Sequence, residues 1–258
     1  MKKIITFCMA SVSLITSANA TTNYHPFQQF NNEFNLNFGM SGATLQNSAG
    51  SQANTTSQKY GLEVERLFNN GVWFDINTNI VVNSLTNQSN GIGSGASIVN
   101  QNPNLGGINI KTGYAFDIVS DNLLLTPYGL VGRNANVAAS TLYYNNNSNI
   151  TNDFYYTLGM GGRLDYRINN KVDLYLDQLV GYNWDQSAPL NGVMPQNNMV
   201  YLTTLGVKYN VYKQLQIGLN GFYNFYNNMA SIPQDTTGAS VYVPVNSYGG
   251  AITFGLTY

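Results

Sequence analysis

Apolar and polar residues alternate along ten segments of the chain with the two-residue period of a β-strand. Residues 34–40, for example, read FNLNFGM, with phenylalanine, leucine and methionine on one face and asparagine and glycine on the other. The ten segments are residues 34–40, 59–68, 72–83, 108–117, 124–133, 154–168, 172–184, 199–211, 215–225 and 248–258. Eight or twelve strands are alternatives, the larger number because residues 84–107 are long enough for a further hairpin.

The gaps between these segments are short and long in strict alternation. Short gaps fall near residues 69–71, 119–122, 169–171 and 212–213, and long gaps fall at 41–58, 84–107, 134–153, 185–198 and 226–247. Outer-membrane β-barrels have this asymmetry, with tight periplasmic turns and long outward loops. The pattern therefore predicts an all-β fold, an antiparallel up-and-down transmembrane β-barrel of about ten strands.

Composition supports a barrel in a membrane. Only 9% of the residues are charged, whereas a soluble domain has about a quarter. No continuous apolar run after residue 20 is long enough for a membrane helix. A transmembrane barrel reconciles both facts, because it shows lipid every second residue and hides its polar residues in the lumen.

The first twenty residues have the features of a signal peptide. Lys2 and Lys3 precede a short apolar stretch, and Ala18-Asn19-Ala20 supplies a small-x-small cleavage site. We expect residues 1–20 to be removed on export, 21–33 to form a periplasmic N-terminal lead-in and 34–258 to form the barrel. Removing the two lysines leaves 9 basic against 12 acidic residues, a net charge of about −3. This weak charge argues against a nucleic acid as partner.

The leader, the alternating strands and the last segment resemble those of small Gram-negative outer-membrane β-barrel proteins, in the broad OmpA, OmpX and opacity-like class. The resemblance implies a location in the outer membrane, in contact with its lipid and lipopolysaccharide. It also implies that an alternating, aromatic-ended last strand is read by the barrel-assembly machinery. The residues of that signal are Tyr248, Gly250, Ile252, Phe254, Leu256 and Tyr258.

The sequence gives little support to catalysis. Enzymes of similar folds rely on a histidine near the outer rim, but the single histidine, His25, precedes the first strand. Asp185 and Asp235 are the only acids well inside the long gaps, and neither has a neighbouring acid or base. The only cysteine, Cys8, lies in the leader. We therefore expect no catalytic site, no metal site and no cofactor.

Most charged residues lie opposite the apolar faces and are predicted to point into the lumen. The set is Glu63, Glu65, Asp75, Lys111, Asp117, Arg133, Arg163, Asp165, Arg167, Asp173, Asp177 and Lys208. Rings of charge line selective pores. Alternatively, opposite charges pair across a narrow interior and fill it, which ten strands favour over an open channel. We expect a largely filled lumen.

Three segments of the long gaps, 41–58, 84–107 and 134–152, hold no acidic or basic residue and are rich in asparagine, serine, glycine and threonine, with apolar residues interspersed. Neutral surfaces with apolar spots suit contact with host or envelope proteins. The leading functional hypothesis is thus an outer-membrane surface protein with a structural or adhesin-like role carried by its loops. A narrow, weakly selective porin-like channel is the alternative.

Overall fold

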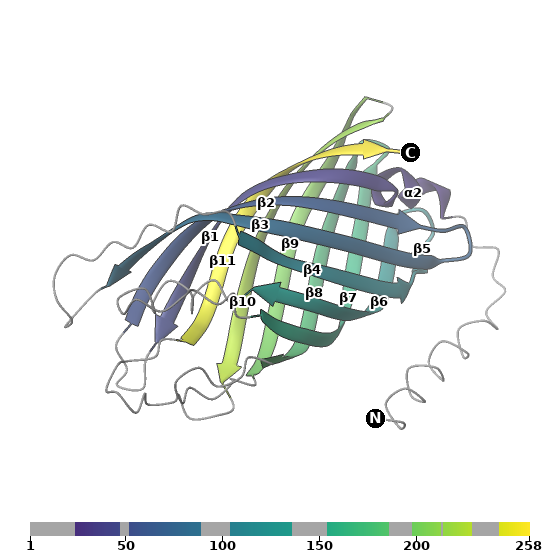
Figure 1. Cartoon of the computed structure of the whole chain (residues 1–258). Coiled ribbons are helices and arrows are strands. Elements are labelled where there is room, and N and C mark those ends of the chain that lie inside the picture. Colours follow the sequence, from purple (N-terminus) through teal and green to yellow (C-terminus); the bar gives the residue numbers. More distant parts are fainter. Residues whose placement is uncertain are drawn as a thin grey trace, which may run out of the picture.

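A computed structural model describes residues 24–46, 52–88, 104–135, 154–185, 198–212, 214–228 and 243–258. Within these ranges the chain forms one short helix and eleven strands (Figure 1). Their bounds are α2 His25–Asn31, β1 Glu33–Gln46, β2 Gln52–Leu67, β3 Val72–Gln88, β4 Asn104–Tyr114, β5 Phe116–Val119, β6 Leu123–Ala135, β7 Phe154–Asn169, β8 Val172–Asp185, β9 Asn198–Tyr212, β10 Leu215–Asn228 and β11 Val243–Thr257. No helix in the described ranges is both long and apolar enough to cross a membrane.

The strands form one closed antiparallel sheet. Except for β4 and β5, which do not pair with each other, strands that follow one another in sequence are paired. Strand β1 also pairs with β11, and pairing of β4 with β6 completes the ring. The short strand β5 follows β4 after a break at Ala115 and pairs with the first residues of β6. Because β4 and β5 occupy successive parts of one wall position, the described wall has ten positions. The predicted ten-stranded up-and-down barrel is confirmed.

Several strands run further toward the long gaps than the apolar pattern predicts. Strand β1 extends past residue 40 to Gln46, and β2 starts at Gln52 instead of residue 59. Polar pairs hold these extensions together: the Ser41 and Ser57 hydroxyls are 2.8 Å apart, and Thr44 Oγ1 donates to Asn54 Oδ1 at 3.2 Å. Hydrogen-bonded pairing thus continues where the apolar alternation has ended. Residues 89–103, where a further hairpin was considered, lie outside the described ranges.

The distribution of apolar and polar residues over the two faces of the wall is the reverse of that in a soluble protein, with apolar residues outside and polar residues inside. On β1 the outward Phe38 and Met40 are 45% and 64% exposed, whereas the inward Glu33 and Asn35 are at most 1% exposed. The last strand follows the same rule, and its outward residues include five of the predicted assembly-signal positions: Tyr248, Ile252, Phe254, Leu256 and Tyr258. An apolar band outside and a polar lumen inside are the arrangement that a lipid bilayer requires.

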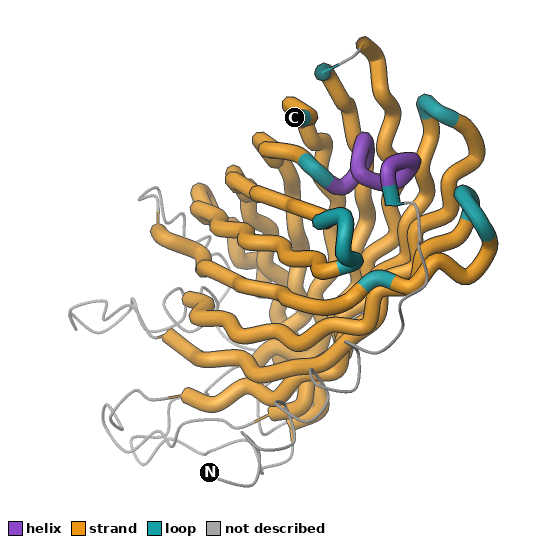
Figure 2. The backbone as a smooth tube through the Cα atoms, turned by 90° about the vertical axis from the view of Figure 1, so that its right-hand side faces the viewer, coloured by secondary structure: helices purple, strands orange, loops and turns teal. Residues whose placement is uncertain are grey.

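The predicted N-terminal lead-in contains a helix that enters the barrel. Pro26 stands in the first turn of α2, where its missing N–H costs nothing. Phe27 and Phe30 are three residues apart, so they share a face, and both are at most 1% exposed. Phe27 belongs to an apolar cluster with the inward-facing Leu67 and Trp73. Figure 2 shows α2 at the barrel end that carries the short turns.

The short turns depend on local backbone chemistry. Gly71 has a φ of 85°, which favours glycine, and its N–H donates to the Phe68 carbonyl at 3.0 Å. A Cβ on Gly71 would lie 2.8 Å from the Tyr24 hydroxyl, just before α2. At the next but one turn, Asn169 Oδ1 accepts from the backbone N–H groups of Lys171 and Val172. The turns and the N-terminal segment therefore form one packed end.

The predicted signal peptide and the central parts of the predicted long gaps lie outside the described residues. These parts are residues 1–20, 47–51, 89–103, 136–153, 186–197 and 229–242. Asp235 is among them.

Candidate functional site

The polar interior of the barrel holds most of the charged residues singled out by the sequence pattern. Eleven of the twelve lie on the inner face, between residues whose side chains point outward: Glu63, Glu65, Asp75, Lys111, Asp117, Arg163, Asp165, Arg167, Asp173, Asp177 and Lys208. They come from seven strands, so the lumen brings together charges that are far apart in sequence.

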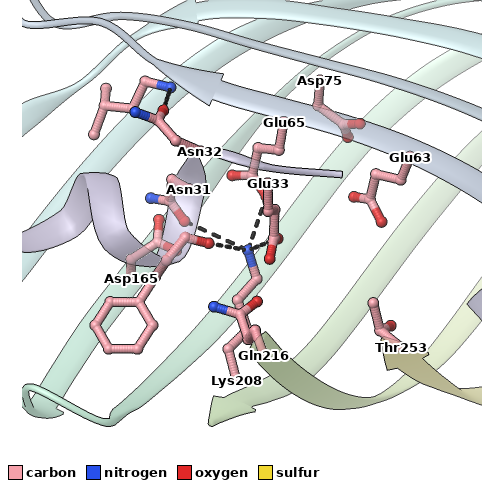
Figure 3. A network of polar contacts seen from close by, with 12 residues as sticks. Asn31, Asn32, Glu33, Glu63, Glu65, Asp75, Asp165, Lys208, Gln216 and Thr253 are labelled. Carbon is pink, nitrogen blue, oxygen red and sulfur yellow. Dashed lines mark hydrogen bonds and ion pairs between the residues drawn. The ribbon is translucent and has the colours of Figure 1, made fainter. Parts of the chain in front are cut away.

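One group of five residues, here called the Lys208 cluster, comprises Glu33, Glu65, Arg163, Asp165 and Lys208. Lys208 Nζ lies 2.5 Å from Glu33 Oε1 and 2.8 Å from Glu65 Oε2 (Figure 3). These side chains are buried, so each charge is stabilised by its partners in place of water. The contacts join β9 to β1 and β2 through the interior.

Arg163 is the second cation of the Lys208 cluster. Its Nη1 lies 3.0 Å from Glu65 Oε1, and its Nη2 lies 2.8 Å from Asp165 Oδ1. The guanidinium carbon is also 4.5 Å from the centroid of the Tyr175 ring, a cation–π contact. Trp73 Nε1 donates to Glu65 Oε1 at 2.8 Å. Glu65 is thereby bonded to Lys208, Arg163 and Trp73 at once.

The helix α2 is bonded directly to this cluster. Lys208 Nζ donates to the Phe30 carbonyl at 2.8 Å, and Arg163 Nη2 donates to Asn31 Oδ1 at 3.3 Å. On other sides, Gln28 Nε2 donates to the Leu67 carbonyl and Asn32 Oδ1 accepts from the Leu67 N–H. Helix and cluster are thus hydrogen-bonded to each other at the short-turn end of the lumen.

A second group, here called the Lys111 cluster, comprises Lys111, Asp75, Asp177 and Tyr128, and it adjoins the Lys208 cluster, because Asp75 pairs in register with Glu65 and Asp177 with Arg163. Lys111 Nζ is 2.7 Å from Asp177 Oδ2 and 3.3 Å from Asp75 Oδ2. The Tyr128 hydroxyl donates to Asp177 Oδ1. The ammonium group of Lys111 is therefore shared between the carboxylates of Asp75 and Asp177.

Acids outnumber bases in the described interior. Among the side chains that the structure describes, the inner face carries eight acids against five bases, Lys59, Lys111, Arg163, Arg167 and Lys208. Several buried oxygens there have no hydrogen-bond partner within the described structure, including Asp75 Oδ1, Asn35 Oδ1 and both Asp173 oxygens.

A row of amides crosses five neighbouring strands of the inner face. Asn109 and Asn134 exchange two hydrogen bonds of 3.1 Å, and Asn109 Nδ2 also donates to Asn77 Oδ1. The row continues from Asn134 to Thr157, whose hydroxyl donates to Asn183 Oδ1 at 2.7 Å. These residues have no charge, which is why a search for charged lumen residues does not find them.

One residue of the predicted lumen set points outward, and two others lie beside short turns. Arg133 pairs in register with the outward-facing Ile108 and is exposed, so its prediction as a lumen residue is wrong. Asp117 lies on the short strand β5 beside a turn. Arg167 donates to the Asp121 carbonyl at 2.6 Å and to Asn170 Oδ1, also at a turn. Asp117 pairs in register with the buried Leu124 and Arg167 with the buried Asp173, so both lie on the inner face at its short-turn end, outside the two clusters.

Two charged residues of the interior were missing from the predicted set. Glu33 stands one residue before the predicted start of the first strand, so a boundary error of one position concealed it. Lys59 shares its face with Glu63 and Glu65, and strict alternation would have placed it in the lumen. The remaining partners, Trp73 and Tyr128, have no sequence signal that separates them from other aromatic residues.

His25 is the first residue of α2 and is exposed at the short-turn end. Within the described ranges, no group of three or more histidine, cysteine, aspartate or glutamate side chains is placed to hold a metal ion. Arg66, on the outer face, lies over the rings of Phe68 and Tyr258 at 4.8 and 5.8 Å, as expected for a cation near the headgroups.

No family model matches the sequence, and no curated protein is significantly similar to it. Solved structures of similar fold include the outer membrane protease OmpT of Escherichia coli, with 10% identity, 88% of this chain and 94% of that chain covered, and a TM-score of 0.41. The β domain of the Bordetella autotransporter BrkA has 9% identity, coverages of 87% and 99%, and a TM-score of 0.45. Ail, the attachment invasion locus protein of Yersinia pestis, has 13% identity, coverages of 87% of this chain and 97% of that chain, and a TM-score of 0.31. The closed wall and the apolar outer face of this chain show a β-barrel of the outer-membrane type. The activities in the names of those proteins are not assigned to this chain.

Proposed function

We propose that the protein is a surface component of the outer membrane, with a filled barrel as scaffold and the long extracellular segments as the functional part. The observation that carries this proposal is the contact of α2 with the Lys208 cluster, since Lys208 Nζ binds the Phe30 carbonyl and two wall carboxylates together. An interior packed in this way stabilises the barrel and leaves no wide path for solutes.

The apolar outer face is suited to permanent contact with the lipid of the membrane. Residues such as Leu205 and Met160, 62% and 71% exposed, are compatible with acyl chains and with the lipid part of lipopolysaccharide. We propose that the outward residues of β11 are also read by the barrel-assembly machinery. No catalytic role is proposed, because His25, the one histidine, lies outside the lumen.

The experiment compares adhesion of cells that display the protein with cells that display a variant in which residues 136–153 and 186–197 are replaced by short Gly-Ser turns. Binding to immobilised host glycoproteins and to neighbouring cells is measured at equal surface levels. The loop-replaced variant should fold but lose adhesion. A matched interior variant, Asp177→Asn, should adhere as the wild type does. Equal adhesion of the wild type and the loop-replaced variant would rule out the adhesin-like role.

A narrow channel is the second candidate, and one observation favours it. Beyond the Lys208 cluster the lumen contains a cavity of about 210 Å³, lined by charged and amide side chains. If α2 leaves the barrel end, this cavity and the Lys111 cluster would line the path of ions.

A further inference from the structure

The lumen cavity has an acidic side and a basic side. It is lined by residues from β1–β4 and from β7–β11, among them Asn37, Lys59, Glu63, Asp75 and Phe222. Three further cations of the lining, Lys111, Arg163 and Lys208, are each already paired with carboxylates. Its volume of about 210 Å³ exceeds what a single ion or water requires, and suits a small organic molecule.

The acidic side consists of Glu63 and Asp75, on the neighbouring strands β2 and β3. Asp75 faces Glu65 in register, one inward position from Glu63, and Figure 3 shows both carboxylates beside the contacts of Lys208. Asp75 is 1% exposed, and its Oδ1 has no hydrogen-bond partner in the described structure.

Neither carboxylate of the acidic side has a cation to itself. Glu63 Oε2 accepts from Asn37 Nδ2 at 3.0 Å, and none of the ion pairs among the described residues includes Glu63. Asp75 Oδ2 is 3.3 Å from Lys111 Nζ, which lies closer to Asp177, at 2.7 Å. A buried oxygen without a donor is costly, so this side of the cavity attracts a hydrogen-bonding cation.

The basic side consists of Lys59. Its Nζ lies 5.0 Å from the centroid of the Phe222 ring, and no carboxylate in the described ranges pairs with it. Lys59 is four residues from Glu63 on the same face of β2, so their Cα atoms are about 13 Å apart at about 3.3 Å per residue. Both side chains line the cavity.

We propose that this cavity binds a small zwitterion, a molecule with an ammonium group at one end and a carboxylate at the other. Its ammonium lies between Glu63 and Asp75 and gives Asp75 Oδ1 a donor, while its carboxylate pairs with Lys59. A short aliphatic chain between the two groups passes Phe222. This binding goes beyond the proposed surface role, which requires no ligand in the lumen.

The test is isothermal titration calorimetry on residues 21–258 refolded in detergent. Three probes of similar length are titrated: ε-aminocaproic acid, hexylamine and caproate. The zwitterion should bind at least about tenfold more tightly than either single-charge probe, because only it pairs with both sides of the cavity. No heat from the zwitterion, or equal binding of all three probes, would overturn the proposal.

Matched variants test which residue binds each end of the zwitterion. Lys59→Met should weaken ε-aminocaproic acid to the affinity of hexylamine and leave hexylamine itself unchanged. Glu63→Gln should weaken both amines and leave caproate unchanged. The exposed turn residue Lys171 gives a control, Lys171→Met, with wild-type binding of all probes. If the zwitterion binds Lys59→Met and Glu63→Gln as tightly as the wild type, the ligand lies elsewhere and the assignment is wrong. Channel recordings test the filled lumen independently of this result.

Discussion

Lys208 of β9 and Glu33 of β1 are 175 positions apart in the chain, yet Lys208 Nζ lies 2.5 Å from Glu33 Oε1. In the order of the sheet, β10 and β11 stand between these two strands, so the contact crosses the interior and does not follow the wall. Because Lys208 also binds the Phe30 carbonyl, it joins the wall to the helix that enters the barrel end.

Replacing Lys208 should destabilise the barrel strongly. Lys208→Met leaves Glu33 without its cation and Glu65 with Arg163 alone, and removing one partner of a buried pair costs about 3–5 kcal/mol. Urea unfolding in lipid vesicles measures the free energy of unfolding of each variant. The control Lys171→Met, at an exposed turn, should change it little. Equal unfolding midpoints for the two variants would show that the pairs around Lys208 add nothing to stability.

The position of the bilayer can be tested on a single strand. Leu205 stands in the middle of β9 and is 62% exposed, whereas Tyr212 is the last residue of β9 and is 73% exposed. Leu205→Arg should lower the free energy of unfolding by about 2–4 kcal/mol and Tyr212→Arg by at most about 1, because a charge costs most at the bilayer midplane. Vesicle unfolding again gives both values. A similar cost at the two sites would contradict the assigned depth.

Gly71 should tolerate no side chain. Its φ of 85° is strained for alanine, and the added Cβ would lie 2.8 Å from the Tyr24 hydroxyl. We expect Gly71→Ala to cost about 1–3 kcal/mol in unfolding free energy. Gly129→Ala is the matched control, since the nearest atom to its Cβ would be 3.9 Å away. Unchanged stability of Gly71→Ala would mean that the turn does not depend on this conformation.

The outward residues of β11 should affect assembly more than stability. Phe254→Asn combined with Leu256→Asn should slow insertion by the assembly machinery, measured as the rate at which the heat-modifiable folded form appears in cells. Leu215→Asn combined with Ile217→Asn, on the neighbouring strand and similarly exposed, is the control. If both pairs slow insertion to the same extent, β11 has no special role in recognition.

Alternation alone was sufficient for the wall of the barrel, because lipid and lumen impose opposite preferences on successive residues. It failed where both faces are apolar. On β6 the inward Leu124, Tyr128 and Leu130 are buried against other interior side chains, so apolar residues occur on both faces. Nothing in the sequence then distinguishes inside from outside, and Arg133 was placed on the wrong face.

The helix α2 could not be predicted from its own residues. Seven residues are too few for a helix that is stable alone, and Phe27 and Phe30 are held by the barrel interior. The partners of each charge were equally hidden, since Lys208 and Glu33 meet only through the curvature of the closed sheet. Sequence alternation thus places charges in the lumen, while closure of the barrel decides which of them pair.

The obstructed lumen is tested most directly by single-channel recording in planar bilayers. Residues 21–258 are compared with a variant that lacks residues 21–32 and so loses α2 but keeps Glu33, after both are shown to be folded by their heat-modifiable migration. We expect no current steps from the longer protein and stable unitary current steps from the variant. Steps of the same amplitude from both proteins would show that α2 does not obstruct the lumen.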